Sequence, residues 1–143
     1  MINKEKLIAE AIIARNKSYA PYSNIRIGAA LQTEDGKIYH GCNIENEVTA
    51  VRVCAERTAI FNAFINNNSK IKAIAIIGNT EKPVIPCEFC KLVLLEMCNK
   101  DTLILMANLK GDFEEMAVKD INPDEKSKKM LGLLIKELRR NKK

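Results

Sequence analysis

Three cysteines and a glutamate carry the strongest chemical signal in this sequence. Cys54 and Glu56 lie two residues apart in "CAE", and Cys87 and Cys90 form a C-x-x-C in "PCEFC". Both segments are predicted to start helices, where unpaired backbone N–H groups and a partial positive charge face the sulfur atoms. That environment favours thiolate over thiol, and thiolates are good ligands for zinc.

The number of ligands indicates the kind of metal site. Three protein ligands with an open fourth position are typical of catalytic zinc, whereas four protein ligands are typical of structural zinc. Cys54, Cys87 and Cys90 supply three, and Glu56 is placed to reach a water molecule at the fourth position. Because three thiolates on one divalent ion leave a net negative charge, we expect Arg57 to donate hydrogen bonds to a ligand sulfur.

Other uses of these cysteines stay open at this stage. A C-x-x-C alone can be a redox pair, although Cys54 and Glu56 would then have no role. A structural four-cysteine site would need Cys42 or Cys98 as its fourth ligand. Cys98 follows Cys90 on the same predicted helix, about 12 Å along it, and Cys42 is expected to be a small buried residue on a strand.

The elements that must position these residues follow from the hydrophobic pattern. Helices are predicted over 3–16, from Cys54 to Ile65, from Pro86 onward and over 124–140. Strands are predicted at 25–32, 38–44, 71–79, 102–108 and 113–118. This order predicts an α/β fold, a three-layer α/β/α sandwich with a mixed five-stranded sheet. Gly28 and Gly41 are expected to allow close packing between elements.

Length, composition and charge limit the classes of protein to which this chain can belong. The 143 residues suit one domain over 1–143. No apolar run is long enough to span a bilayer, and the charged N-terminus is no secretory signal, so we expect a cytoplasmic protein with reduced thiols. Residues 126–143 contain eight Lys or Arg residues and one Glu, whereas the whole chain has a net charge of +5. The positive charge is therefore concentrated in this C-terminal segment. The remaining body is close to neutral, which makes a nucleic-acid partner an unfavoured alternative.

The motifs together resemble a known family. C-x-E followed by P-C-x-x-C is the zinc deaminase signature in an all-cysteine form. With "YAPYSNIRIGAAL", "GCNIEN", "CAERTAI" and "PCEFC" in the family's order and spacing, the chain closely resembles the small homotetrameric cytidine deaminases. The resemblance implies a Zn²⁺ cofactor and hydrolytic deamination of cytidine or deoxycytidine to uridine or deoxyuridine plus ammonia. Glu56 would be the proton shuttle, in a homotetramer that serves pyrimidine salvage.

The resemblance also implies a substrate pocket. The family's Asn and Glu that bind the ribose hydroxyls match Asn43 and Glu45. The backbone around Ala55 and Pro86 would bind the ring, with the Ala55 N–H as the clearer donor. Ile25 stands where the family usually has a Phe that packs against the pyrimidine, a contact that contributes about 1 kcal/mol.

Several pocket positions depart from the family pattern. Thr49 replaces an aromatic residue, Glu47 replaces a small one, and the family's "PCGxCRQ" is "PCEFCKL" here. The C-terminal "LLPxxF" segment is absent. These departures keep two alternatives open: a deaminase of another aminated heterocycle such as blasticidin S, and a non-catalytic, zinc-stabilised binding protein. Blasticidin S deaminases usually lack the Glu that matches Glu45.

Overall fold

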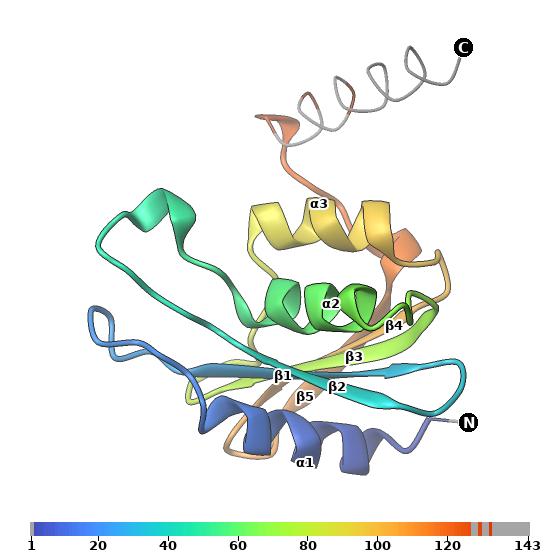
Figure 1. The fold of residues 1–143 in the computed structure, drawn as a ribbon, viewed down its shortest axis with the longest axis horizontal. Coiled ribbons are helices and arrows are strands. Elements are labelled where there is room, and N and C mark those ends of the chain that lie inside the picture. Colours follow the sequence, from blue (N-terminus) through green and yellow to red (C-terminus); the bar gives the residue numbers. More distant parts are fainter. Residues whose placement is uncertain (1, 127–128, 130–131, 133–143) are drawn as a thin grey trace.

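A single mixed sheet between two helical layers organises the protein (Figure 1). The computed structural model describes residues 2–126, 129 and 132. Its helices are α1 (Lys4–Arg15), α2 (Ala55–Ile65) and α3 (Glu88–Met97), and its strands are β1 (Ile27–Thr33), β2 (Ile38–Cys42), β3 (Ile71–Gly78), β4 (Leu103–Asn108) and β5 (Phe113–Ala117). Helix α1 covers one face of the sheet, and α2 and α3 cover the other. The predicted α/β/α sandwich with a mixed five-stranded sheet is therefore confirmed.

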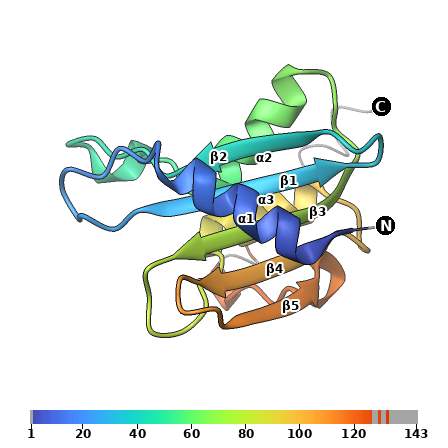
Figure 2. The same ribbon diagram turned by 90° about the horizontal axis from the view of Figure 1, so that it is seen from below.

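The strand order of the sheet is β2-β1-β3-β4-β5, and the pairing of β3 with β4 determines where α3 lies (Figure 2). β3 and β4 run parallel, whereas the other three neighbouring pairs are antiparallel. A parallel pair needs a long crossover connection, and α3 supplies it. The N-terminus of α3 therefore lies beyond the carboxyl end of β3. Among the described residues, no helix is long and apolar enough to cross a membrane.

The core consists of two apolar clusters, one on each face of the sheet. Helix α1 contributes Leu7 and Ala11 to the cluster on its side, which also contains Ile77 and Leu105. Helix α2 contributes Ala59 and Ile60, and α3 contributes Leu94, to the cluster on the other side. Because helices cover both faces, β1 and β3 are buried on both sides, and the simple in-and-out alternation of a half-exposed strand is lost.

Gly28 and Gly41 allow the two helical layers to approach the sheet closely, as expected. A Cβ atom at Gly28 would lie 2.1 Å from the carbonyl oxygen of Ala11 in α1. A Cβ atom at Gly41 would lie 2.3 Å from the backbone nitrogen of Ala59 in α2. Both contacts are with helix backbone, which has little freedom to move away, so neither position has room for a side chain.

Some predicted boundaries differ from the structure for local reasons. The strand predicted over 25–32 begins only at Ile27, because the Asn43 side chain replaces a neighbouring strand there. Asn43 donates to the carbonyl oxygen of Ile25 at 2.7 Å and accepts from the backbone N–H of Ile27 at 2.8 Å. Helix α3 begins at Glu88, with Cys87 as its N-cap, rather than at Pro86. The helix predicted over 124–140 lies largely outside the described residues.

Substituting Gly28 with Ala tests this packing. We expect Gly28→Ala to lower the free energy of unfolding by about 1–3 kcal/mol, the usual cost of overpacking. Thermal unfolding followed by circular dichroism would show this as a fall in Tm of several degrees. Lys72→Ala, at an exposed position of β3, is the control and should change Tm much less. Equal Tm values for the two variants would contradict the proposed close contact.

Candidate active site

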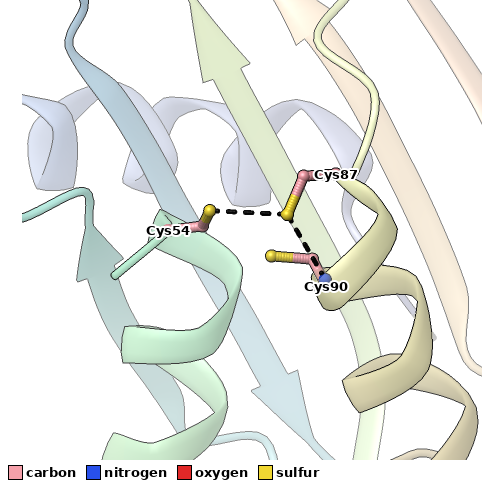
Figure 3. A group of neighbouring side chains, drawn as sticks. All are labelled: Cys54, Cys87 and Cys90. Carbon is pink, nitrogen blue, oxygen red and sulfur yellow. Dashed lines mark hydrogen bonds between the residues drawn. The ribbon is translucent and has the colours of Figure 1, made fainter. Parts of the chain in front are cut away.

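The three predicted cysteines meet where α2 and α3 begin (Figure 3). Cys54 is the N-cap of α2, Cys87 is the N-cap of α3, and Cys90 lies in the first turn of α3. Their sulfur atoms all lie within 4.8 Å of one another, with 3.5 Å between Cys54 and Cys87. Within the described part of the chain, this is the only group of three or more His, Cys, Asp or Glu residues that could hold a metal ion.

The sulfur spacing fits a tetrahedral zinc ion. Zinc–sulfur bonds of about 2.3 Å at tetrahedral angles place two sulfurs about 3.8 Å apart. The 3.5 Å between Cys54 and Cys87 is close to that separation. Cys42, at the end of β2, and Cys98, at the C-cap of α3, do not belong to the group. The arrangement therefore provides three sulfur ligands, and the four-cysteine alternative gains no support.

The thiols interact too strongly to ionise independently. Hydrogen bonds with Cys54 and Cys90, and one from the Cys90 backbone N–H, lower the pKa of Cys87 to about 2. Hydrogen bonding to Cys87 raises the pKa of Cys54, and hydrogen bonding to Cys54 raises that of Cys90. The three sulfurs therefore titrate as one group, in which ionisation of one disfavours ionisation of its neighbours. Full ionisation of all three requires a bound cation, which is how metal binding releases protons from a thiol site.

Arg57 makes the contact predicted for it. Its Nη2 atom donates to the sulfur of Cys54 and to the carbonyl oxygen of Arg52, both at 3.3 Å. Its Nε atom is buried and has no hydrogen-bond partner among the described residues. The guanidinium is therefore held against the sulfur group, where a positive charge offsets the thiolates.

Glu56 lies in the first turn of α2, directly beside the sulfur group. Its side chain is buried, with the residue only 4% exposed. Burial raises the pKa of its carboxyl, while hydrogen bonds from its own backbone N–H and from Cys90 counteract part of this rise. Glu56 lines the same cavity as Cys54 and Cys87. A carboxyl in this position can exchange protons with a molecule bound in the cavity.

The cavity has a volume of about 310 Å³, at the small end of the usual range for ligand pockets. Polar groups lie at two places in its wall, the sulfur and Glu56 region and the segment that contains Asn43 and Glu45. Apolar side chains form much of the remainder. The residues that line it are Ile27, Asn43, Glu45, Arg52, Val53, Cys54, Ala55, Glu56, Val84, Ile85 and Cys87.

The structure brings most of the predicted substrate residues to this cavity. Ala55 is buried in its wall, and Asn43 lines it with a side-chain amide fixed by the backbone of β1 and the residues before it. Ile25 is 56% exposed and is not among the residues that line the cavity. Pro86 is buried and lines a neighbouring hollow instead.

Glu45 is buried, at 8% exposed, and its carboxylate is held by the segment before β1. One oxygen accepts the backbone N–H groups of Tyr22 and Ser23, both at 3.1 Å, and the other accepts the Ser23 hydroxyl at 2.5 Å. The hydroxyl bond is the main cause of a lowered pKa for Glu45, with smaller contributions from the backbone N–H groups. The carboxylate is therefore ionised and fixed in orientation at the cavity wall.

Five further residues of the wall were not predicted from the sequence: Ile27, Arg52, Val53, Val84 and Ile85. Ile27 is the first residue of β1. The other four lie in the segments 45–53 and 80–86, which are mostly irregular and show no period from which an inward face could be inferred. The sequence feature that could have identified these four residues is their position immediately before the ligand motifs. Residues that precede a helix N-cap must pass close to that N-cap.

The fold and the site together define a zinc-dependent deaminase enzyme. Residues 1–106 match the family model for the cytidine and deoxycytidylate deaminase zinc-binding region. The chain belongs to this family, and its cofactor is zinc.

Individual relatives agree over most of the chain. It is 49% identical to a cytidine deaminase of Sporosarcina psychrophila, over 90% of this chain and 94% of that protein. It is 42% identical to a cytidine deaminase of Halalkalibacterium halodurans, over 85% and 92% respectively. A crystal structure of cytidine deaminase from Burkholderia pseudomallei superposes with a TM-score of 0.82 at 41% identity, covering 87% of this chain and 98% of that one.

Serine substitutions at four of the five cysteines test the proposed ligand set. We expect purified wild type to contain about one zinc per chain, and Cys87→Ser or Cys90→Ser to lose most of it, because a neutral hydroxyl is a far weaker ligand than a thiolate. Cys42→Ser and Cys98→Ser are the matched controls and should keep their zinc. Elemental analysis by mass spectrometry gives the stoichiometry. Zinc loss in a control, with retention in Cys87→Ser, would contradict the assignment.

Arg57→Gln tests whether the guanidinium stabilises the thiolates. Because the variant loses a charge beside Cys54, we expect zinc to be removed by a chelator about tenfold or more faster than from wild type, the usual effect of losing such a supporting contact. Release is followed with a chromogenic chelator. Lys72→Gln, at an exposed position on β3, is the control. Unchanged release from Arg57→Gln would show that the contact does not stabilise the bound metal.

Proposed function

We propose that this chain catalyses the hydrolytic deamination of cytidine and deoxycytidine, which yields uridine or deoxyuridine plus ammonia. The observation that carries the proposal is the buried carboxyl of Glu56 beside the three sulfur atoms, at the wall of a cavity large enough for a ligand. The relatives described above as cytidine deaminases support the choice of substrate.

Different residues of the chain have different roles in this reaction. Cys54, Cys87 and Cys90 would hold the zinc, which when bound lowers the pKa of a water molecule to roughly 7. Glu56 takes a proton from the attacking water and delivers protons to ring N3 and to the leaving amine. The burial that raises its pKa suits this role, because the carboxyl must hold a proton between the two transfers. The Ala55 N–H would donate to the ring carbonyl.

The opposite part of the cavity would bind the sugar. We propose that Asn43 and Glu45 bind the ribose hydroxyls, with Ile25 as the counterpart of the family's aromatic residue beside the ring. The Asn43 amide and the Glu45 carboxylate are already fixed by backbone hydrogen bonds, so little conformational freedom is lost when a substrate binds. The buried, ionised Glu45 also favours a nucleoside over an aminated compound that lacks sugar hydroxyls.

The wider setting of the enzyme is also a proposal. We propose one domain over 1–143, a homotetramer, a cytoplasmic location and a role in pyrimidine salvage. Large apolar side chains are exposed in the segments that border the cavity, namely Tyr19, Tyr22, Ile25, Val48, Val51, Ile85 and Phe89. Apolar side chains gathered in this way are commonly covered by another protein surface, which supports assembly of several copies.

Ammonia release from a panel of compounds tests the function. The panel contains cytidine, deoxycytidine, blasticidin S, free cytosine and a guanine-type compound. We expect wild type to act on cytidine and deoxycytidine, and Glu56→Gln to lower kcat by about 10²–10⁴-fold or more, because the proton shuttle is lost. Zinc content should stay unchanged, which separates loss of the shuttle from loss of the metal.

Glu96→Gln is the matched control, since Glu96 is exposed on α3 and far along the helix from the ligands. It should keep wild-type turnover. Release from blasticidin S but not from cytidine would contradict the proposed substrate. Release from none of the compounds by a zinc-loaded protein would favour a non-catalytic binding protein.

A further inference from the structure

An exposed turn before β1 holds the buried carboxylate of Glu45. Residues 22–26 are exposed, whereas Glu45 is buried and lines the cavity. The backbone N–H of Asn24 donates to the carbonyl oxygen of Ala20 at 3.0 Å, and Asn24 has a positive φ of 59°. Asn adopts this left-handed conformation more readily than most residues do. The chain therefore turns sharply here, and the reaction proposed above assigns no role to the side chains of the turn other than Ile25.

The hydroxyl of Ser23 is directed at Glu45 by a second contact. Its Oγ atom accepts the backbone N–H of Ile25 at 3.0 Å and donates to Oε2 of Glu45 at 2.5 Å. A serine hydroxyl has a single proton, so the contact with Ile25 leaves that proton for the carboxylate. Ser23 is not among the residues that line the cavity. Its side chain therefore acts on a molecule in the cavity through Glu45.

The two oxygens of the Glu45 carboxylate are used unequally. An ionised carboxylate has about four acceptor positions, two on each oxygen. Oε1 accepts the backbone N–H groups of Tyr22 and Ser23, which occupy both of its positions. Oε2 accepts only the Ser23 hydroxyl from the described residues, so one position on this oxygen remains for a further donor. The oxygen that the hydroxyl orients is therefore the one that can accept a hydroxyl of a bound sugar.

Other contacts hold the turn in place independently of this hydroxyl. The guanidinium carbon of Arg52 lies 5.0 Å from the centre of the Tyr22 ring, within the range of a cation–π contact. At the other end of the turn, the side-chain amide of Asn43 donates to the carbonyl oxygen of Ile25 at 2.7 Å. Loss of the hydroxyl should therefore leave the turn and its two N–H bonds to the carboxylate intact, and should release Oε2 alone.

We propose that Ser23 is a positioning residue for sugar recognition: its hydroxyl orients Oε2 of Glu45 to accept one ring hydroxyl of the nucleoside. This inference rests on the proposed function, in which Glu45 binds the sugar. An acceptor that is fixed before the substrate arrives loses less conformational freedom on binding. The same hydroxyl is the main cause of the lowered pKa of Glu45, and the ionised carboxylate can only accept hydrogen bonds, as a sugar hydroxyl donor requires.

The test measures kcat and KM by ammonia release from the zinc-loaded full chain, with cytidine and with 2′,3′-dideoxycytidine, which lacks both ring hydroxyls. We expect Ser23→Ala to raise KM for cytidine about tenfold, the typical loss for a hydrogen bond to a charged group. Its kcat should stay nearly unchanged, because the sugar contact is made equally in the ground state and the transition state. The kcat/KM for the dideoxy compound should change little. Ser23→Thr keeps the hydroxyl and should keep the wild-type KM.

A second comparison removes the group through which Ser23 would act. In a Glu45→Gln background, Ser23→Ala should have little further effect on kcat/KM for cytidine, because the two residues form one unit. An independent structural contribution of Ser23 would lower kcat/KM by the same factor in both backgrounds. Ser69→Ala is the matched control, since it removes the same group from another exposed serine. It should keep the wild-type KM.

Several results would overturn the proposal. These are an unchanged KM for cytidine in Ser23→Ala, a loss in kcat in place of KM, an equal loss for cytidine and the dideoxy compound, and an equal loss with and without Glu45. Each of them leaves cytidine deamination standing. Failure of wild type to release ammonia from cytidine would remove the proposed function, and this inference with it.

Discussion

The structure depends on bringing three sulfur atoms from two helices within 4.8 Å of one another. Such a group is unfavourable when ionised alone, because like charges repel, and it becomes favourable when a divalent cation binds. The sheet makes the approach possible. Gly41 lets α2 lie against β2, and the parallel pairing of β3 with β4 requires a crossover connection, which α3 makes on the same face as α2. Both N-termini, with their partial positive charges, then face the sulfurs.

The sulfur group and Glu45, at two places in the cavity wall, are connected by a short series of contacts. The sulfur of Cys54 accepts from Arg57, which also donates to the carbonyl of Arg52. The side chain of Arg52 contacts the ring of Tyr22, whose backbone N–H is bound by Glu45. Each group in this series is held by a named partner, so the cavity is largely preformed. A preformed site aligns the reacting groups at little cost in conformational entropy when the substrate binds.

The grouping of the three sulfurs was predictable from the sequence because it is encoded locally. A C-x-x-C at a helix start places two sulfurs within one turn, and the C-x-E motif adds the third sulfur and the carboxyl nearby. The sequence order of the helices and strands, and the mixed sheet that this order implies, followed from the hydrophobic pattern. The walls of the cavity did not, because Arg52 and Ile85 lie in irregular segments whose orientation depends on contacts distant in sequence. Ile25 illustrates the same limit, since the Asn43 side chain determines where β1 begins.

X-ray absorption at the zinc edge of the purified, zinc-loaded protein tests the central claim most directly, because it counts the atoms bound to the metal and identifies their type. The structure predicts three sulfur neighbours at about 2.3 Å and one lighter oxygen or nitrogen neighbour. A fourth sulfur in place of the lighter atom would indicate a closed structural site and would contradict the catalytic account, as would fewer than three sulfurs.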